Sequence, residues 1–138
     1  MFFSFQCKVP NFMIQGGDIT HYDGTGGESI YGEYYEDELP ISNGKHLKHD
    51  KKHFLTMANK GRPNTQSSQF FINTVKTHWL DGNNEKYFDR NGMNVIIGKV
   101  VEGSDVIRQI EEQGTNSGIP RRRVVIRDSG EIHVNSMD

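Results

Sequence analysis

Three histidines have the spacing of a possible metal site. His46, His49 and His53 stand at i, i+3 and i+7, which would place them on one face of a helix as ligands. The same stretch also contains four lysines, Lys45, Lys48, Lys51 and Lys52. Their charge would repel a cation, so the pattern favours a solvated loop over a metal centre.

The glycine-rich segment Gly24-Thr-Gly-Gly27 could in principle hold a phosphate, because such turns expose backbone N–H groups to anions. A Walker loop ends in Gly-Lys-Ser/Thr, whereas this segment continues with Glu28 and Ser29. A dinucleotide-binding turn needs a strand before it, and residues 18–23 offer none. The segment therefore predicts a tight structural turn.

The sequence gives little support for nucleophilic catalysis or for nucleic-acid binding. Cys7 is the single cysteine, no GxSxG signature is present, and a small buried apolar role for Cys7 is favoured over a reactive thiol. The cluster Arg121-Arg122-Arg123 is too short for a nucleic-acid stripe and predicts a solvated turn.

The elements that must position any site are mostly strands. Residues 5–15 predict one or two short strands broken at Pro10, followed by a turn at Gly16-Gly17. Residues 18–53 lack helical periodicity and predict a long folded loop. Further strands are predicted at 54–58, 68–74, 94–101 and 123–127.

One helix is predicted over residues 104–113. Ser104 has the side chain of an N-cap, and Gly114 is a natural stop. Val106, Ile107 and Ile110 are expected to share its apolar face.

Composition excludes several classes of protein. The 138 residues suffice for one domain, and 16 Lys plus Arg nearly balance 18 Asp plus Glu. This balance gives no reason to expect nucleic acid or an anionic membrane as a partner. No apolar run approaches the ~20 residues of a membrane span, and the start lacks secretory signal features. We expect an intracellular protein, cytoplasmic or nuclear.

Aromatic, methionine and amide side chains are concentrated in strands that border long loops. Taken alone, such a set is more typical of a core than of a pocket. Its members are Phe12, Met13, Gln15, Met57, Asn59, Gln69, Phe71 and Trp79.

Seven ordered motifs change that interpretation. They are PNFMIQGGD (10–18), DGTGGESIYG (23–32), YEDE (35–38), LTMANKG (55–61), SQFFINT (68–74), WLDG (79–82) and IIGKVVEG (96–103). Over residues 9–134 the chain resembles the cyclophilin-type peptidyl-prolyl cis-trans isomerases. The resemblance implies a mainly β fold, a closed eight-stranded antiparallel barrel with two helices, and an outer groove that binds Xaa-Pro peptides. It implies no cofactor and no metal.

The resemblance also assigns the site position by position. Phe12, Met13, Phe71 and Leu80 would form the floor of a proline pocket, with Trp79 at its rim, where cyclosporin-type ligands bind in sensitive members. Gln15 and Gln69 would donate hydrogen bonds to the peptide, and the Ala58-Asn59 backbone would pair with it. Gln15, Phe12 and Phe71 are the residues expected to act in catalysis.

Three positions depart from the family pattern. Cys7 stands where the family has the arginine that donates to the prolyl nitrogen, so the main catalytic donor is missing. Lys8 does not replace it, because adjacent strand residues point to opposite faces. Asn94 stands where a histidine is common, and the resemblance places it among the residues that bind substrate. Ser67 stands where a glycine is common. Arg62, in an insertion, is expected to be a solvated turn residue.

The chain is expected to be one cyclophilin-like domain, 1–138, that lacks the first two strands and first helix of the family. Residues 1–6 are interpreted as intron-derived sequence rather than native domain. Three hypotheses follow: an isomerase with reduced or lost activity, a proline-peptide binding module without catalysis, or a fragment that does not fold. We expect a monomer whose partners are proline-containing peptides and proteins.

Overall fold

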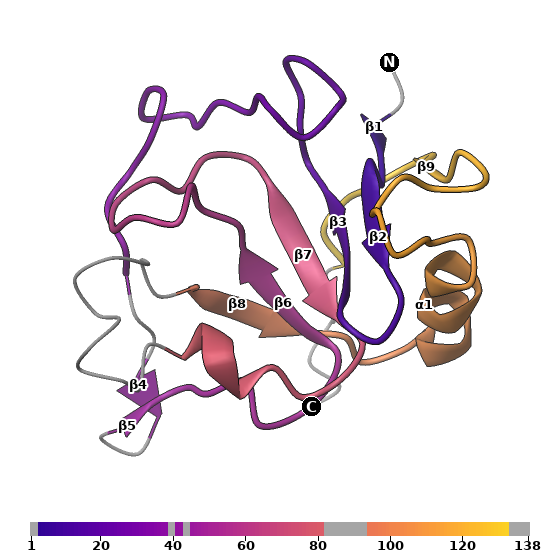
Figure 1. Cartoon of the computed structure of the whole chain (residues 1–138). Coiled ribbons are helices and arrows are strands. Elements are labelled where there is room, and N and C mark those ends of the chain that lie inside the picture. Colours follow the sequence, from indigo (N-terminus) through magenta and orange to yellow (C-terminus); the bar gives the residue numbers. More distant parts are fainter. Residues whose placement is uncertain (1–2, 39–40, 43–44, 82–93, 133–138) are drawn as a thin grey trace.

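The computed structural model describes residues 3–38, 41–42, 45–81 and 94–132 (Figure 1). In this part of the chain no helix is long and apolar enough to cross a bilayer.

A five-stranded antiparallel sheet forms the centre of the molecule. Its strand order is β2-β3-β7-β6-β8, and α1 packs against β2 and β3 (Figure 1). The bounds are β2 Cys7–Val9, β3 Met13–Gly16, β6 Phe54–Met57, β7 Phe70–Asn73 and β8 Ile96–Lys99. In the described residues β2 and β8 are not joined, so the sheet is open. The mainly β class and the incomplete barrel predicted from the sequence are confirmed.

Two short ladders lie outside this sheet. β1, Phe3–Ser4, pairs with β9, Val125–Ile126, and the Phe5 N–H donates to the Val124 carbonyl. The last predicted strand, 123–127, is therefore shorter than expected. The described residues of the loop 18–53 are irregular as predicted except for β4, Ile41–Ser42, and β5, Lys45–His46, which pair with each other. The expectation that residues 1–6 are intron-derived concerns the gene and stays a prediction.

Turn chemistry explains where the first central strands end. The chain reverses after Pro10, as predicted, with Asn11 at φ 57° and the Phe12 N–H donating to the Val9 carbonyl. After β3, Gly17 has φ 88°, and a Cβ there would lie 2.3 Å from the Ser68 carbonyl oxygen. Only glycine lets the two segments approach this closely.

Helix α1 spans Ser104–Glu111, close to the predicted range. Its N-cap is Gly103 at φ 84°, not Ser104, because the Ser104 hydroxyl bonds His53 Nδ1 at 3.2 Å and caps no backbone N–H. Ile107 is buried and Ile110 half-buried, whereas Val106 is 52% exposed. Including Val106 in the apolar face was therefore wrong, since it lies about 100° around the helix from Ile107.

Lys8 lies inside the fold with 0% exposure. Its Nζ donates to the Phe5 carbonyl at 2.9 Å and to the Arg122 carbonyl at 3.5 Å. Burial lowers the pKa of this amine, and the neighbouring Cys7 opposes the shift. The β2–β3 register pairs Lys8 with Ile14, so Lys8 faces away from Cys7 as the sequence predicted.

Asp18 organises the glycine-rich loop. The N–H groups of Thr20 and His21 donate to its Oδ1, and those of Asp23, Gly24 and Gly26 donate to its Oδ2. The carboxylate is buried and occupies the position that a bound anion would take. This geometry explains why the segment is a structural turn.

Asp18→Asn is expected to lower the free energy of unfolding at pH 7 by about 1–3 kcal/mol, because a neutral amide accepts these bonds less well. Burial raises the pKa of the Asp18 carboxyl, but its backbone hydrogen bonds outweigh burial and hold that pKa far below the usual range. The stabilisation is therefore present above the unfolded pKa, about 3.9, and is lost as the pH falls below it.

Urea unfolding followed by circular dichroism at pH 7, 5 and 3 measures this effect. The gap between parent and variant should be constant from pH 7 to 5 and smaller at pH 3. Asp50→Asn, at an exposed position, is the control. Equal stability of the Asp18 variant and the parent at pH 7 would contradict the assignment.

Candidate active site

Strand register places four side chains in one row across the sheet. Cys7 pairs with Gln15, Gln15 with Phe71, and Phe71 with Thr56. Directly opposed residues of antiparallel strands project from the same face. The row therefore brings two of the expected catalytic residues, Gln15 and Phe71, beside the Cys7 position. The parallel row of Lys8, Ile14, Ile72 and Leu55 projects from the other face.

The Gln69 side chain connects the row to the glycine-rich loop. Its Oε1 accepts from Gln15 Nε2 at 2.7 Å, and its Nε2 donates to the carbonyls of Gly24 and Gly26 at 3.0 and 2.6 Å. Because Nε2 faces two carbonyl oxygens, the orientation of this amide is fixed. Gln69 is buried and fully hydrogen-bonded within the protein, so its main effect is to orient Gln15.

Gln6 also reaches this network, although no sequence signal marked it. Its Nε2 donates to Gln69 Oε1 at 3.0 Å, so one carbonyl oxygen accepts from two glutamine amides. Gln6 Oε1 is buried and has no hydrogen-bond partner among the described residues.

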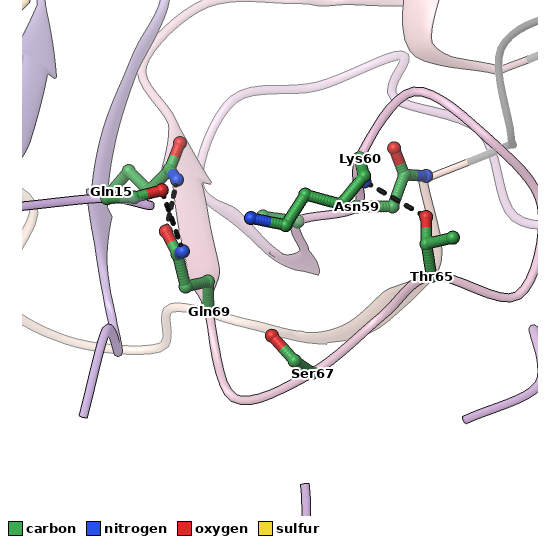
Figure 2. Close-up of a pocket in the computed structure, with 8 residues that line it drawn as sticks. Gln15, Asn59, Lys60, Thr65, Ser67 and Gln69 are labelled. Atoms are coloured by element: carbon green, nitrogen blue, oxygen red, sulfur yellow. Dashed lines mark hydrogen bonds between the residues drawn. The ribbon is translucent and has the colours of Figure 1, made fainter. Parts of the chain in front are cut away.

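A polar pocket of about 50 Å³ lies beside the Gln15–Gln69 pair (Figure 2). It is lined by Gln15, Gly24, Ala58, Asn59, Lys60, Thr65, Ser67 and Gln69. Four of these residues, Gln15, Ala58, Asn59 and Gln69, were predicted to bind substrate. The pocket has room for a small polar group.

Lys60 and Thr65 are pocket residues that sequence reasoning missed. The Lys60 side chain crosses the pocket, and its Nζ donates to the Thr25 carbonyl at 2.9 Å. The Lys60 N–H is held by Thr65 Oγ1 at 3.0 Å, a bond drawn in Figure 2. Arg62, in the same turn, is exposed as predicted.

The apolar part of the site lies around the turn between β2 and β3 and around η1, His78–Leu80. The rings of Phe12 and Trp79 are 5.8 Å apart with an interplanar angle of 43°. Trp79 is 65% exposed, Leu80 is half-buried, and Phe71 and Met13 are buried. Met13 lies two residues from Gln15 on β3 and so shares its face.

Asn94 ties two site segments together. Its Nδ2 donates to the Met57 carbonyl at 3.1 Å, and its backbone N–H donates to the Leu80 carbonyl at 3.4 Å. Asn94 therefore braces the end of β6 against η1. Its predicted contact with substrate, like the other predicted residue roles, stays a prediction.

Cys7 is half-buried, and burial raises the pKa of its thiol while the Lys8 amine opposes the shift. At neutral pH the group is an uncharged thiol. A Cβ on Gly118 would lie 2.7 Å from Cys7 Sγ, so the segment after α1 packs closely against it. The side chain at this position supplies no positive charge.

The sequence offered His46, His49 and His53 as possible metal ligands. Among the described residues, no group of three His, Cys, Asp or Glu side chains is placed to hold a metal. The expectation of a solvated loop is wrong for His49, which is 1% exposed. Its imidazole is buried because Asp81 and Thr56 satisfy both ring nitrogens.

The open antiparallel sheet, the one α-helix of the described residues and the amide-lined site on one sheet face define a mainly β domain of the cyclophilin fold. The family model described as cyclophilin-type peptidyl-prolyl cis-trans isomerase/CLD matches residues 2–131, and the chain belongs to this family of enzymes. The crystal structure of a cyclophilin-type peptidyl-prolyl cis-trans isomerase from Cryptosporidium parvum is similar, with 36% identity and a TM-score of 0.74. The match covers 92% of this chain and 71% of that one. The resemblance found in the sequence is confirmed.

Gln69→Glu tests the orienting role of Gln69. The substitution keeps the shape but puts a carboxylate oxygen against the Gly24 and Gly26 carbonyls. Their repulsion should destabilise the fold by about 1–3 kcal/mol and turn the side chain away from the loop, which would move the Gln15 amide bonded to it. Urea unfolding and ¹⁵N shifts of the Gln15 side-chain amide measure both effects. Gln109→Glu, on the exposed side of α1, is the matched control. An unchanged Gln15 amide signal in folded Gln69→Glu protein would refute the role.

Proposed function

We propose that this chain binds Xaa-Pro segments of peptides and folding proteins and accelerates their cis–trans rotation, at a rate limited by the neutral side chain at position 7. The observation that carries the proposal is the row Cys7–Gln15–Phe71, which brings an amide donor and an aromatic ring together on one sheet face. The uncatalysed barrier is about 18–20 kcal/mol and arises from amide resonance.

Binding would precede rotation. The proline ring would lie on Phe12, Met13, Phe71 and Leu80, with Trp79 at the rim. The flanking peptide would pair with backbone near Ala58 and Asn59. Because the Ala58 N–H already donates to the Gln69 carbonyl at 3.0 Å, this pairing would use the Ala58 carbonyl.

Catalysis needs a donor that interacts more strongly with the twisted bond than with the planar one. Twisting localises a lone pair on the prolyl nitrogen, so an N–H directed at it stabilises the transition state selectively. Gln15 Nε2 has a second proton beyond the one given to Gln69. A neutral amide is a weaker donor than a guanidinium, which is the physical reason to expect a reduced rate.

A second candidate function is proline-peptide binding without catalysis. It is favoured by the uncharged, half-buried Cys7 thiol at the position that the resemblance assigns to the catalytic arginine. We also propose that the protein is a monomer inside the cell, and that a cyclosporin-type cyclic peptide would compete for the surface around Trp79.

The polar pocket gives the proposed site a side-chain preference. In an extended peptide alternate side chains point the same way, so a residue two positions from the proline would reach the pocket. Lys60 would then favour an acidic or polar side chain there.

Cys7→Arg should raise kcat/KM for a Xaa-Pro peptide by about 10²-fold, the usual effect of one transition-state donor. Peptide affinity should stay within threefold, because the substitution adds a donor to the twisted state only. Two-dimensional exchange NMR measures the rotation rate, Trp79 fluorescence the affinity, and Cys7→Ala is the control. If folded parent and Cys7→Arg protein both bind peptide but rotate it only at the uncatalysed rate, the chain is a binding module without catalysis. If neither protein binds peptide, both proposed functions are refuted.

Lys60→Glu should reverse the preference for charge in the pocket. The test peptides carry Glu or Lys two positions before or two positions after the proline. At one of these two positions the parent should bind the Glu peptide about fivefold more tightly than the Lys peptide, as expected for an exposed ion pair of about 1 kcal/mol. The variant should prefer Lys there. Lys99→Glu, on β8 and outside the pocket, makes the same change of net charge. Identical preferences in parent and Lys60→Glu would exclude Lys60 from recognition.

A further inference from the structure

A buried histidine lies directly behind the row of site residues. His49 is 1% exposed, and its ring stacks on the Phe71 ring with centroids 6.4 Å apart and an interplanar angle of 18°. The Phe54 ring meets the same imidazole edge-on at 6.3 Å. The predicted site residues would contact peptide with their exposed side, whereas the buried His49 contacts the side chains of Phe71 and Thr56.

Both ring nitrogens of His49 are engaged. Nδ1 lies 2.6 Å from Asp81 Oδ1, and Nε2 lies 3.0 Å from Thr56 Oγ1. Since a carboxylate only accepts, Nδ1 carries the proton, and Nε2 accepts the Thr56 hydroxyl proton. Burial lowers the pKa of the imidazole, with Asp81 opposing, which agrees with a neutral ring. Two in-plane bonds fix the ring plane and so fix the surface offered to Phe71.

The backbone of His49 holds both ends of η1, the turn that carries Trp79 and Leu80. Its carbonyl accepts from the Thr77 N–H at 3.0 Å, at the N-cap. Its N–H donates to Asp81 Oδ1 at 2.7 Å, at the C-cap. The same carboxylate oxygen therefore receives the backbone and the ring N–H of one residue.

Asp81 has few other contacts. It is 3% exposed, and its Oδ2 has no hydrogen-bond partner among the described residues. His78 Nδ1 is 3.8 Å from Oδ2, too far for a hydrogen bond, and its side chain is 60% exposed. The carboxylate thus depends on His49 for its close hydrogen bonds.

We propose that His49 is a positioning residue for the proline site, because it fixes the plane behind Phe71 and both ends of the Trp79–Leu80 turn at once. The inference rests on the proposed function only for its effect on peptide. Apolar walls contributed by different elements fit a proline ring only when their separation is held. Loss of the clamp should therefore weaken binding and leave the chemical step less affected.

His49→Asn keeps a donor near the Nδ1 position and removes the stacked ring and the Thr56 bond. It should raise the peptide KM or Kd about tenfold with kcat changed less than threefold. Trp79, the single tryptophan, reports the clamp without substrate. Its fluorescence anisotropy should show a larger fast component in the variant, because the buried ring anchors the backbone of residue 49, and that backbone holds both ends of η1.

Three companion variants separate positioning from loss of stability. Thr56→Val removes only the hydroxyl bond and should show a smaller change in the same direction. Asp81→Asn combined with His49→Asn should raise KM little beyond either single variant, since both break one clamp. Ile107→Val, in the buried face of α1, removes one buried methyl group and so lowers stability modestly, and it should leave KM and Trp79 anisotropy unchanged.

The outcomes distinguish the two levels of the proposal. Unchanged Trp79 anisotropy and KM in folded His49→Asn protein would overturn the positioning role, and so would an equal change in Ile107→Val. A parent that binds no peptide would overturn the proposed function, while the anisotropy of Trp79 would still decide whether His49 holds η1. If His49→Asn does not fold, Thr56→Val carries the same test.

Discussion

The register of four antiparallel strands is the constraint on which the site depends. Side chains on a strand alternate between faces, so one register decides that Cys7, Gln15, Phe71 and Thr56 share a face and that Lys8 and Ile14 lie opposite. A slip of one residue in β2 would bring the Lys8 amine toward Gln15 and place Cys7 inside. The buried bonds of Lys8 to two backbone carbonyls oppose that slip, because an amine with fixed acceptors is costly to move. A buried lysine looks unfavourable in a core, yet Lys8 thus helps to fix the strand register on which the site depends.

Two separate polar networks support the row from its two sides. On one side Asp18 gathers the backbone N–H groups of the glycine-rich loop, and the carbonyls of that loop fix Gln69 and through it Gln15. On the other side Asp81 and Thr56 fix His49 behind Phe71. Each network ends in a carboxylate with little exposure, and buried charges are stable only where hydrogen bonds satisfy them. The four side chains of the row are thus neutral, and they are held by carboxylates that lie outside the row.

Much of the fold could be predicted from short-range patterns. The central strands, the break at Pro10, the helix near 104–113 and the family motifs depend on residues close in sequence, and these were found. The errors arose where distant residues decide the outcome. His49 stands among lysines and looked solvated, yet its partner Asp81 is 32 residues away. Ser104 looked like a cap, but His53 takes its hydroxyl. Gln6 reaches the site through Gln69, 63 residues away, and no local pattern marks such a contact.

Under the proposed function, the neutral side chain at position 7 separates peptide binding from rate acceleration, two properties that one site normally combines. In the proposed function, binding depends on apolar walls, Gln15 and the backbone near Ala58, and none of these needs a charge. Acceleration depends on a donor directed at a nitrogen that becomes basic only when the bond is twisted, and a charged donor gains most from that change. Burial raises the pKa of the Cys7 thiol, so the side chain is uncharged at neutral pH. Gly118 packs closely against its sulfur. No described contact in the strand register or in the two supporting networks requires a positive charge at position 7. Under this proposal, the residues that recognise peptide are independent of the residue that sets the rate.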